Sequence, residues 1–132
     1  MTLNIGQAAK ASGVSAKMIR YYERIGLIPA ATRTANSYRV YGDSDVHTLR
    51  FIRRARDLGF GTTQIAQLVQ LWQNRERASA EVKQIALAHV TELDRKITEM
   101  RTMRDTLDHL ARHCHGDSRP ECPILEDLAR GR

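Results

Sequence analysis

Two cysteines carry the most distinctive chemistry of this 132-residue chain. Cys114 and Cys122 are its only cysteines, and the polar segment between them contains Gly116 and Pro120. Thiolates are soft ligands that favour Cu(I), zinc or iron–sulfur clusters. Two thiolates are too few for a structural zinc site, which takes four protein ligands, or for an iron–sulfur cluster, which usually takes four cysteines. Two thiolates alone suit a soft monovalent ion, which accepts a low coordination number.

Other interpretations of the cysteine pair stay open at this point. His113 and His115 flank Cys114 and could raise the number of ligands, so zinc is not excluded. A structural disulfide is typical of secreted mini-proteins, whereas residues 1–4 do not resemble a secretory signal and no apolar run could cross a membrane. We therefore expect a cytoplasmic protein with reduced thiols. Incidental thiols usually lie in cores, and these lie in a polar loop; the spacing alone favours neither a metal site nor incidental thiols.

The N-terminal part of the sequence predicts a helix-turn-helix. We expect a first helix over residues 5–11 and a second over residues 16–25, with Ser15 as its N-cap and Gly26 closing it. A helix-turn-helix lays its second helix in the major groove of DNA. The side chains that read DNA should therefore come from residues 15–25.

A short basic and aromatic segment follows the two helices. Pro29 ends any helix, and residues 30–42 contain Tyr38-Arg39-Val40-Tyr41, which fits a small β-ribbon or wing. Residues 1–56 have a net charge of +7, whereas residues 57–132 have a net charge of −1. The positive charge coincides with the helix-turn-helix pattern, which indicates phosphate contact rather than an ordinary basic surface.

Two more amphipathic helices are predicted after the wing. We expect Asp43 or Ser44 to cap the first, which ends at Gly59, and Thr62 or Thr63 to cap the second. Arginines on the first helix should be solvated and the apolar residues of both helices should face inward. The arginines are Arg50, Arg53, Arg54 and Arg56, and the apolar residues are Val46, Leu49, Ile52, Leu58, Ile65, Leu68, Val69 and Trp72.

A long helix should begin after Ser79 and cover residues 80–111. Its apolar residues recur at alternating steps of three and four, with one polar interruption at Arg104, which is a heptad pattern. At 1.5 Å per residue this helix would extend about 48 Å. It could fold back on its own N-terminal domain, but the remaining chain is too short to cover it, so a second copy is the simplest partner. The heptad residues are Ala86, Val90, Leu93, Ile97, Met100, Leu107 and Ala111.

Together these elements resemble the MerR family of metal- and stress-responsive transcription regulators, over almost the whole chain. The most specific motifs are Arg20-Tyr21-Tyr22-Glu23, Gly26-Leu27-Ile28 and Tyr38-Arg39-Val40-Tyr41. The Cys-x7-Cys-Pro loop and Ser79-Ala80-Glu81-Val82-Lys83 resemble the copper-responsive, CueR/HmrR-like branch. The implied fold is mainly all-α: a winged helix-turn-helix domain over 1–75, an antiparallel coiled-coil dimerisation helix over 79–112, and a metal-binding loop and tail over 113–132.

The resemblance also implies roles for individual residues. Cys114 and Cys122 would bind Cu(I), or Ag(I) or Au(I), as a near-linear bis-thiolate. Branch members that sense divalent ions have a cysteine where this chain has Ser79, so Ser79 favours a monovalent ion, although it could also act only as a helix N-cap. Ser37 departs from the glycine that many members have in the wing. The implied DNA contacts are Lys17, Arg20 and Tyr22 on the second helix, Arg33, Tyr38, Arg39 and Tyr41 in the wing, and Arg56 on phosphate.

The implied function is a metal-responsive transcriptional activator of metal-resistance or efflux genes. A homodimer would occupy a promoter that has an overlong spacer between its two recognition elements. Metal would reshape the dimer so that it bends and untwists the DNA, which lets RNA polymerase engage. The alternatives are a redox-, drug- or Zn(II)-responsive regulator of the same fold, or a cytosolic metal-binding protein or metallochaperone. No motif suggests a nucleophile–base pair or a pair of acids, so we expect no enzyme.

Overall fold

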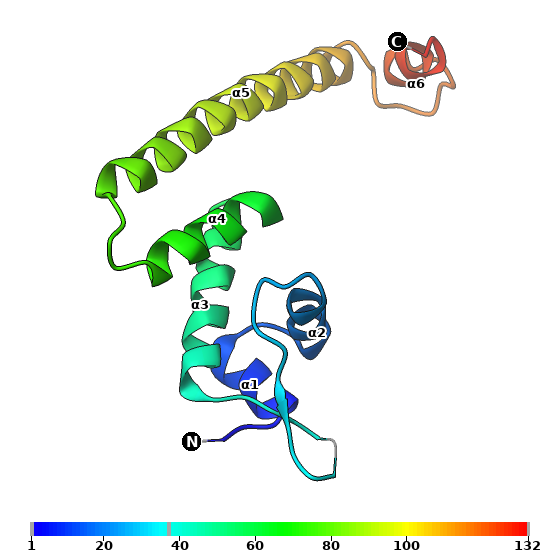
Figure 1. Ribbon diagram of the computed structural model, residues 1–132. Coiled ribbons are helices and arrows are strands. Elements are labelled where there is room, and N and C mark those ends of the chain that lie inside the picture. Colours follow the sequence, from blue (N-terminus) through cyan, green and yellow to red (C-terminus); the bar gives the residue numbers. More distant parts are fainter. Residues whose placement is uncertain (1, 37, 132) are drawn as a thin grey trace. The chain divides into compact units, whose positions relative to one another are not determined.

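The computed structural model describes residues 2–36 and 38–131 and is predominantly helical, which confirms the predicted fold class (Figure 1). It divides into two compact units, Met1–Ile85 and Ala86–Arg132, and the division falls within the long helix. In chain order the elements are α1 (Ile5–Ser12), α2 (Ala16–Arg24), β1 (Thr32–Arg33), β2 (Arg39–Val40), α3 (Asp43–Asp57), α4 (Thr62–Gln73), α5 (Ser79–Arg112) and α6 (Pro123–Ala129).

The first two helices begin where polar side chains cap them. The Asn4 side chain accepts a hydrogen bond from the Gln7 amide at 2.8 Å, and the Gln7 side chain accepts one from the Asn4 amide at 2.9 Å. This reciprocal pair is a capping box, which satisfies two amides that the start of a helix leaves unpaired. Ser15 caps α2 by accepting from the Met18 amide at 3.2 Å, so its predicted role is confirmed.

The caps of α3 and α4 differ from the prediction. Gly42 precedes α3 and Gly61 precedes α4, and neither has a side chain that could cap the helix. The Asp45 carboxylate instead accepts from the Gly42 amide at 2.9 Å, and the Gln64 side chain accepts from the Gly61 amide at 3.0 Å. Asp45 and Gln64 each occupy the third position of their helix and accept from the amide of the glycine that caps it. Each helix therefore begins directly after its glycine, before the Asp, Ser or Thr residues that we expected to precede it. Capping by Asp43, Ser44, Thr62 or Thr63 was therefore wrong.

The hydrophobic core lies in the first unit, where α1 contacts α2 and α3, and α3 contacts α4. Leu49 and Ile52 on α3 are fully buried, as predicted, but Leu58 is 49% exposed because it lies just beyond the end of α3. Trp72 on α4 is 39% exposed and stacks on Phe51, with ring centroids 4.4 Å apart. The core residues are Ala8, Val14, Ile19, Tyr22, Leu27, Ile28, Tyr41, Leu49, Ile52, Ala55, Ile65 and Val69.

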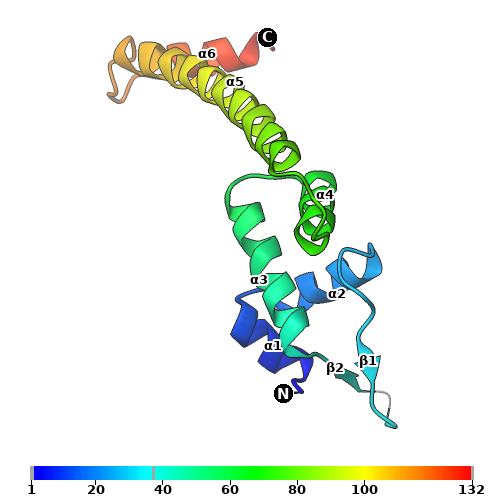
Figure 2. The same ribbon diagram turned by 60° about the vertical axis from the view of Figure 1, so that its left-hand side comes forward.

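The wing is an antiparallel ribbon in which Thr32 pairs with Val40 and Arg33 with Arg39 (Figure 2). A bridge between Leu3 and Tyr41 joins the ribbon to the chain segment before α1, through two backbone hydrogen bonds of 2.8 Å. The wing is therefore held at its base by the N-terminal segment. Ser37, at which we noted a departure from the family pattern, lies outside the described residues.

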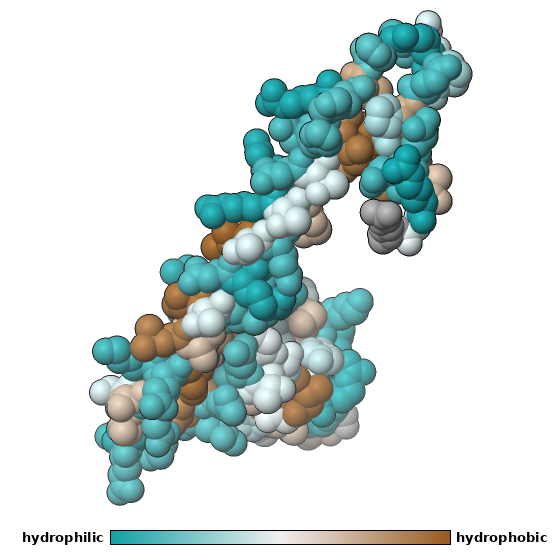
Figure 3. All heavy atoms as spheres, turned by 90° about the horizontal axis from the view of Figure 1, so that it is seen from above, coloured by the Kyte–Doolittle hydropathy of each residue, from teal (hydrophilic) through white to brown (hydrophobic). Residues whose placement is uncertain are grey.

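The second unit contains most of α5, the loop with the two cysteines, and α6. Heptad side chains on α5 are strongly exposed in the single chain: Val90 is 50%, Ile97 46% and Met100 64% exposed. Figure 3 shows hydrophobic side chains at intervals along an otherwise hydrophilic surface. Among the described residues, no helix combines the length and apolar character needed to cross a membrane.

Candidate DNA-binding face and thiol site

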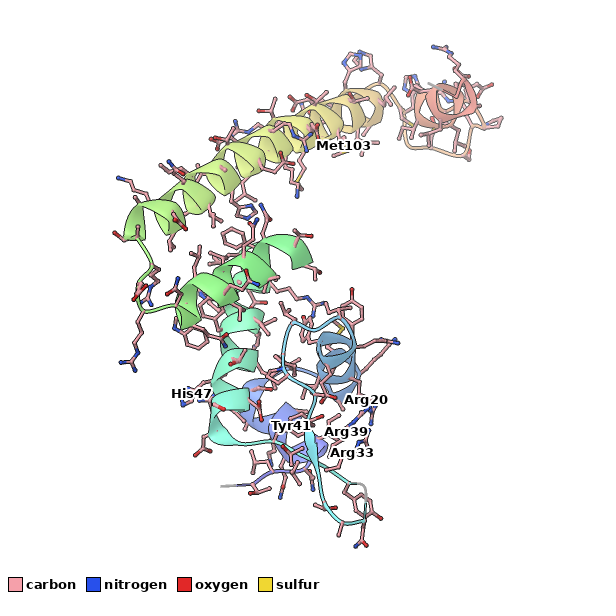
Figure 4. All side chains as sticks on the ribbon, in the orientation of Figure 1. Arg20, Arg33, Arg39, Tyr41, His47 and Met103 are labelled. Atoms are coloured by element: carbon pink, nitrogen blue, oxygen red, sulfur yellow. The ribbon has the colours of Figure 1, made fainter. Side chains whose placement is uncertain are left out.

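A basic cleft lies between α2 and the wing. Its charged lining residues are Lys17, Arg20, Glu23, Arg24, Arg33 and Arg39, so five cations surround one carboxylate. Figure 4 shows Arg20, Arg33 and Arg39 together on one side of this unit, and His47 of α3 on the other. A cleft lined by one sign of charge concentrates ions of the opposite sign. This arrangement suits the phosphate backbone of a nucleic acid.

Tyr38 extends the basic cleft toward the end of the wing. Its side chain is 70% exposed, and it lines an adjoining hollow with Arg20, Arg33 and Arg39. The Tyr38 amide donates to the Thr34 hydroxyl at 3.2 Å, which closes the turn of the ribbon. An exposed aromatic ring among arginines can contact DNA without first leaving a core. The position of Tyr38 therefore suits the contact that the family resemblance implies.

Tyr41 has a different position from the one expected of a DNA contact. Its side chain is 1% exposed, and its hydroxyl donates a hydrogen bond to the Glu23 carboxylate. Burial and the Glu23 carboxylate raise the pKa of Tyr41 far above its usual value, so the hydroxyl keeps its proton and remains a donor. The second Glu23 oxygen lies 3.7 Å from Arg39 Nε. The burial of Tyr41 argues against direct DNA contact and indicates that Tyr41 holds the wing against α2.

Glu23 is a site residue that we did not identify from the sequence. Its side chain is only 9% exposed, and it connects α2 to both Arg39 and Tyr41 of the wing. The available signal was the charge pattern, because Glu23 is an isolated acid in a strongly basic segment. Such an acid within a DNA-binding motif is a candidate for positioning the neighbouring cations.

Tyr22 and Arg56 form a polar pair between α2 and α3. The Tyr22 ring belongs to the core, with the residue 3% exposed, and its hydroxyl accepts a hydrogen bond from Arg56 Nη1 at 3.5 Å. Both residues line a hollow together with Ser15 and Arg53. The structure therefore limits a Tyr22 contact with DNA to its hydroxyl group, beside the Arg56 guanidinium.

The two cysteines lie close together in the second unit. Cys114 follows the end of α5 and Cys122 immediately precedes α6; both are half-buried free thiols. Their sulfur atoms are 4.0 Å apart, about twice the length of a disulfide bond. The amide of Leu125 donates to the Cys122 sulfur, and this contact, with smaller ones from Ile124 and Cys114, lowers the pKa of the Cys122 thiol. Cys122 is thus predisposed to the thiolate form that binds metals.

Few other metal ligands accompany these sulfurs. Within residues 2–36 and 38–131, no group of three or more His, Cys, Asp or Glu side chains could hold a metal ion. His113 Nδ1 hydrogen-bonds the carbonyl oxygen of His109 at 2.7 Å, and His115 is exposed. Ser79 is the first residue of α5 and belongs to the first unit, whereas both cysteines belong to the second. One chain therefore offers a donor set of two sulfur atoms.

Two family models match the chain and together cover most of it. Residues 4–41 match the MerR family regulatory protein model, and residues 46–110 match the model described as MerR, DNA binding. The HTH-type transcriptional regulator HmrR of Sinorhizobium medicae (strain WSM419) is 65% identical over 129 residues, which cover 98% of this chain and 88% of that protein.

More distant similarities agree with this assignment. The regulator CueR of Salmonella typhimurium (strain LT2) is 39% identical over 127 residues, covering 96% of this chain and 92% of that protein. The crystal structure of the transcription regulator PbrR691 from Ralstonia metallidurans CH34, in complex with lead(II), superposes with a TM-score of 0.79. That match has 31% sequence identity and covers 96% of this chain and 98% of the other.

These similarities confirm the predicted family and exclude an enzyme as the interpretation of the chain. MerR regulators act as dimers that bind promoter DNA and contact RNA polymerase, which agrees with the predicted partners. The chain belongs to the MerR family of DNA-binding transcription regulators.

Proposed function

We propose that this regulator is a transcriptional activator that senses Cu(I), or Ag(I) or Au(I), through Cys114 and Cys122. The observation that carries the proposal is the pair of free, half-buried sulfur atoms 4.0 Å apart, without a cluster of further donors among the described residues. A soft monovalent ion is satisfied by few thiolates, whereas zinc sites in proteins usually have four ligands. The number of donors, rather than their softness alone, favours the monovalent ions.

The spacing of the two sulfurs fits one shared ion. With a metal–thiolate bond of about 2.3 Å, two sulfurs on the same ion are at most about 4.6 Å apart. The observed 4.0 Å lies within this limit, so the loop needs only a small adjustment to bind one ion through both cysteines. The regulator PbrR691, which was crystallised with lead(II), has a similar fold, so the fold by itself does not select the charge of the ion. The ligands that each protein supplies must therefore select the ion.

Ser79 supports monovalent selectivity in this proposal. It stands where the family resemblance implies a cysteine in regulators of divalent ions, and it offers a hard hydroxyl in place of a third soft sulfur. Ser79→Cys should therefore add affinity for Zn(II) or Hg(II) in the dimer. Ser79→Asp should preserve the Cu(I) response if Ser79 serves only the start of α5, because an acidic side chain is favourable in the first turn of a helix.

The DNA-binding role rests on the first unit, and dimerisation on the second. We assign the winged domain to residues 1–75, an antiparallel coiled coil to 79–112, and the metal loop and tail to 113–132. Direct DNA contacts are assigned to cations of the basic cleft, to the exposed Tyr38 side chain, and to the Tyr22 hydroxyl with its neighbour Arg56. They are Lys17, Arg20, the Tyr22 hydroxyl, Arg33, Tyr38, Arg39 and Arg56.

The switch requires that the metal favours one of two states of the DNA-bound dimer. Bending and untwisting a promoter costs a few kcal/mol, which protein–DNA contacts can offset. Metal binding can drive that distortion only if the metal binds the distorting state more tightly. Closing the loop around an ion held by two thiolates is the proposed source of this difference. The regulator would then work in the bacterial cytoplasm and activate metal-resistance or efflux genes.

A metal titration tests this function. Reduced dimer should bind one Cu(I) per chain, and promoter activation should rise with Cu(I) but not with Zn(II). Cys114→Ser with Cys122→Ser should abolish the response and leave promoter occupancy unchanged, because a hydroxyl is a poor ligand for a soft ion. A reporter that still responds to copper in the double variant would falsify the site assignment.

A redox response is the second candidate, because two free thiols 4.0 Å apart could close to a disulfide after a modest movement. A metal-free, oxidised dimer would then activate the promoter. Activation by a thiol oxidant in the presence of a metal chelator supports this candidate, and activation by Cu(I) under reducing conditions supports copper sensing.

A further inference from the structure

Two histidines that the thiol site does not require lie one helical turn apart near the end of α5. His109 and His113 are both exposed, and their ring centroids are 4.2 Å apart with the ring planes at 43°. Residues four apart in an α-helix are neighbours on one face. The rings therefore meet at the surface of the second unit, where an ion from solvent can reach them.

The hydrogen bond of His113 prepares its ring as a ligand. His113 Nδ1 lies 2.7 Å from the carbonyl oxygen of His109. A carbonyl oxygen only accepts hydrogen bonds, so this contact places the proton on Nδ1, and the neutral ring then carries its lone pair on Nε2. Histidines that bind metals usually donate their other ring N–H to a carbonyl or carboxylate, which sets the tautomer and the orientation. His113 already has this arrangement without a metal.

We propose that His109 and His113 form a second metal site, for divalent ions that prefer imidazole, such as Zn(II), Ni(II) or Cu(II). The nearest carboxylates along the helix are engaged elsewhere: Asp105 pairs with Arg104, and Asp108 pairs with Arg112. Since one chain has no cluster of three donors among its described residues, we expect water to complete the coordination. The ion should therefore bind far more weakly than in a four-ligand structural zinc site, and exchange freely.

An ion at this site would act on the end of α5. It would link residues four apart in the last turn, the turn in which the Cys114 amide donates to the Ala111 carbonyl at 3.2 Å. A divalent ion would thus stabilise the helix end from which the thiol loop starts. This effect on the loop rests on the proposed function, but the binding itself does not.

The binding is tested with untagged, full-length protein carrying Cys114→Ser and Cys122→Ser, titrated with NiCl2 by calorimetry. We expect one Ni(II) per chain. Loss of an outer partner of a metal ligand typically weakens binding 10–100-fold, so His109→Gln or His113→Gln, which removes a ligand, should weaken it at least about tenfold. His47→Gln, on α3 of the first unit, and His115→Gln, outside the His109–His113 pair, should leave the affinity unchanged. Circular dichroism checks that each variant is folded.

A second arm keeps the native cysteines. Wild-type protein is first saturated with Ag(I), which occupies the thiolates, and is then titrated with NiCl2. Retained Ni(II) binding that His109→Gln removes supports the separate site. Absence of saturable Ni(II) binding in both arms, or binding that the two histidine variants leave unchanged, overturns it. Failure of the copper reporter alone would overturn the proposed function and leave the histidine site standing.

Discussion

The two units of this regulator differ in how much of their apolar surface the single chain can bury. The first unit, Met1–Ile85, contains the whole hydrophobic core, with Ala8, Ile19, Leu49 and Ile52 fully buried. In the second unit, His89 is the one buried residue among those described, and the heptad side chains remain exposed. The first unit thus buries a core of its own, whereas the heptad face of α5 stays uncovered in the single chain, as we expect of a dimerisation surface.

The largest effect should come from a cavity in the first unit. Leu49→Ala removes a fully buried side chain and should lower the free energy of unfolding by about 2–5 kcal/mol. Leu125→Ala, at a position 65% exposed in the second unit, should change it by less than about 0.5 kcal/mol. Urea denaturation measures both values. Equal losses would contradict the contrast between a self-sufficient core and an uncovered surface.

Charges introduced on the heptad face of α5 should weaken the dimer and so test whether this face needs a partner. Leu93→Asp with Ile97→Asp would bury two unpaired charges in a coiled coil and should weaken dimerisation by about 3 kcal/mol, roughly 100-fold. Sedimentation equilibrium measures the change. Thr98→Asp with Thr102→Asp adds the same charge off the heptad positions and serves as the control. A wild-type monomer at micromolar concentration would contradict this interface.

Loss of one cation should lower DNA affinity when the cation lies in the basic cleft of the first unit, but not when it lies in the second unit. Arg20→Ala removes a group from the basic cleft and should cost about 1–3 kcal/mol in DNA affinity if Arg20 makes a bidentate base contact. Arg101→Ala, on α5, removes the same charge from the second unit and should be nearly neutral. Gel shifts at fixed salt compare the two. Equal losses would show that the DNA face lies elsewhere.

The smallest effect should come from the wing contact inside the first unit. Tyr41→Phe removes the hydroxyl that donates to the nearly buried Glu23 carboxylate, and should lower stability by about 1–2 kcal/mol. Tyr38→Phe, at an exposed position, should leave stability unchanged. Thermal denaturation measures both. A Tyr41→Phe variant as stable as wild type would show that the Glu23 contact does not hold the wing.

Local sequence patterns were sufficient for α1 to α5, for the Ser15 cap and for the two-cysteine loop, but not for α6, which lies in the segment predicted only as a tail. Such features depend on residues within a few positions of one another, so periodicity and capping preferences predict them. The family motifs extended the prediction to the cations between α2 and the wing, because residues 15–25 and 30–42 are themselves short, continuous segments. The caps of α3 and α4 escaped prediction because a glycine followed by a third-position Asp or Gln competed with nearby Asp, Ser and Thr.

The sequence by itself determined the family, the basic first half, the uncovered heptad face of α5 and the donor count of two thiols. Only the tertiary structure decided which tyrosines are available to DNA: Tyr38 is 70% exposed and Tyr41 is 1% exposed, although both belong to one four-residue motif. It also decided that Glu23 joins Tyr41 and Arg39, and that the sulfurs of Cys114 and Cys122 are 4.0 Å apart. The physical reason is that burial and contact distances depend on segments distant in the chain packing together, which no local pattern records.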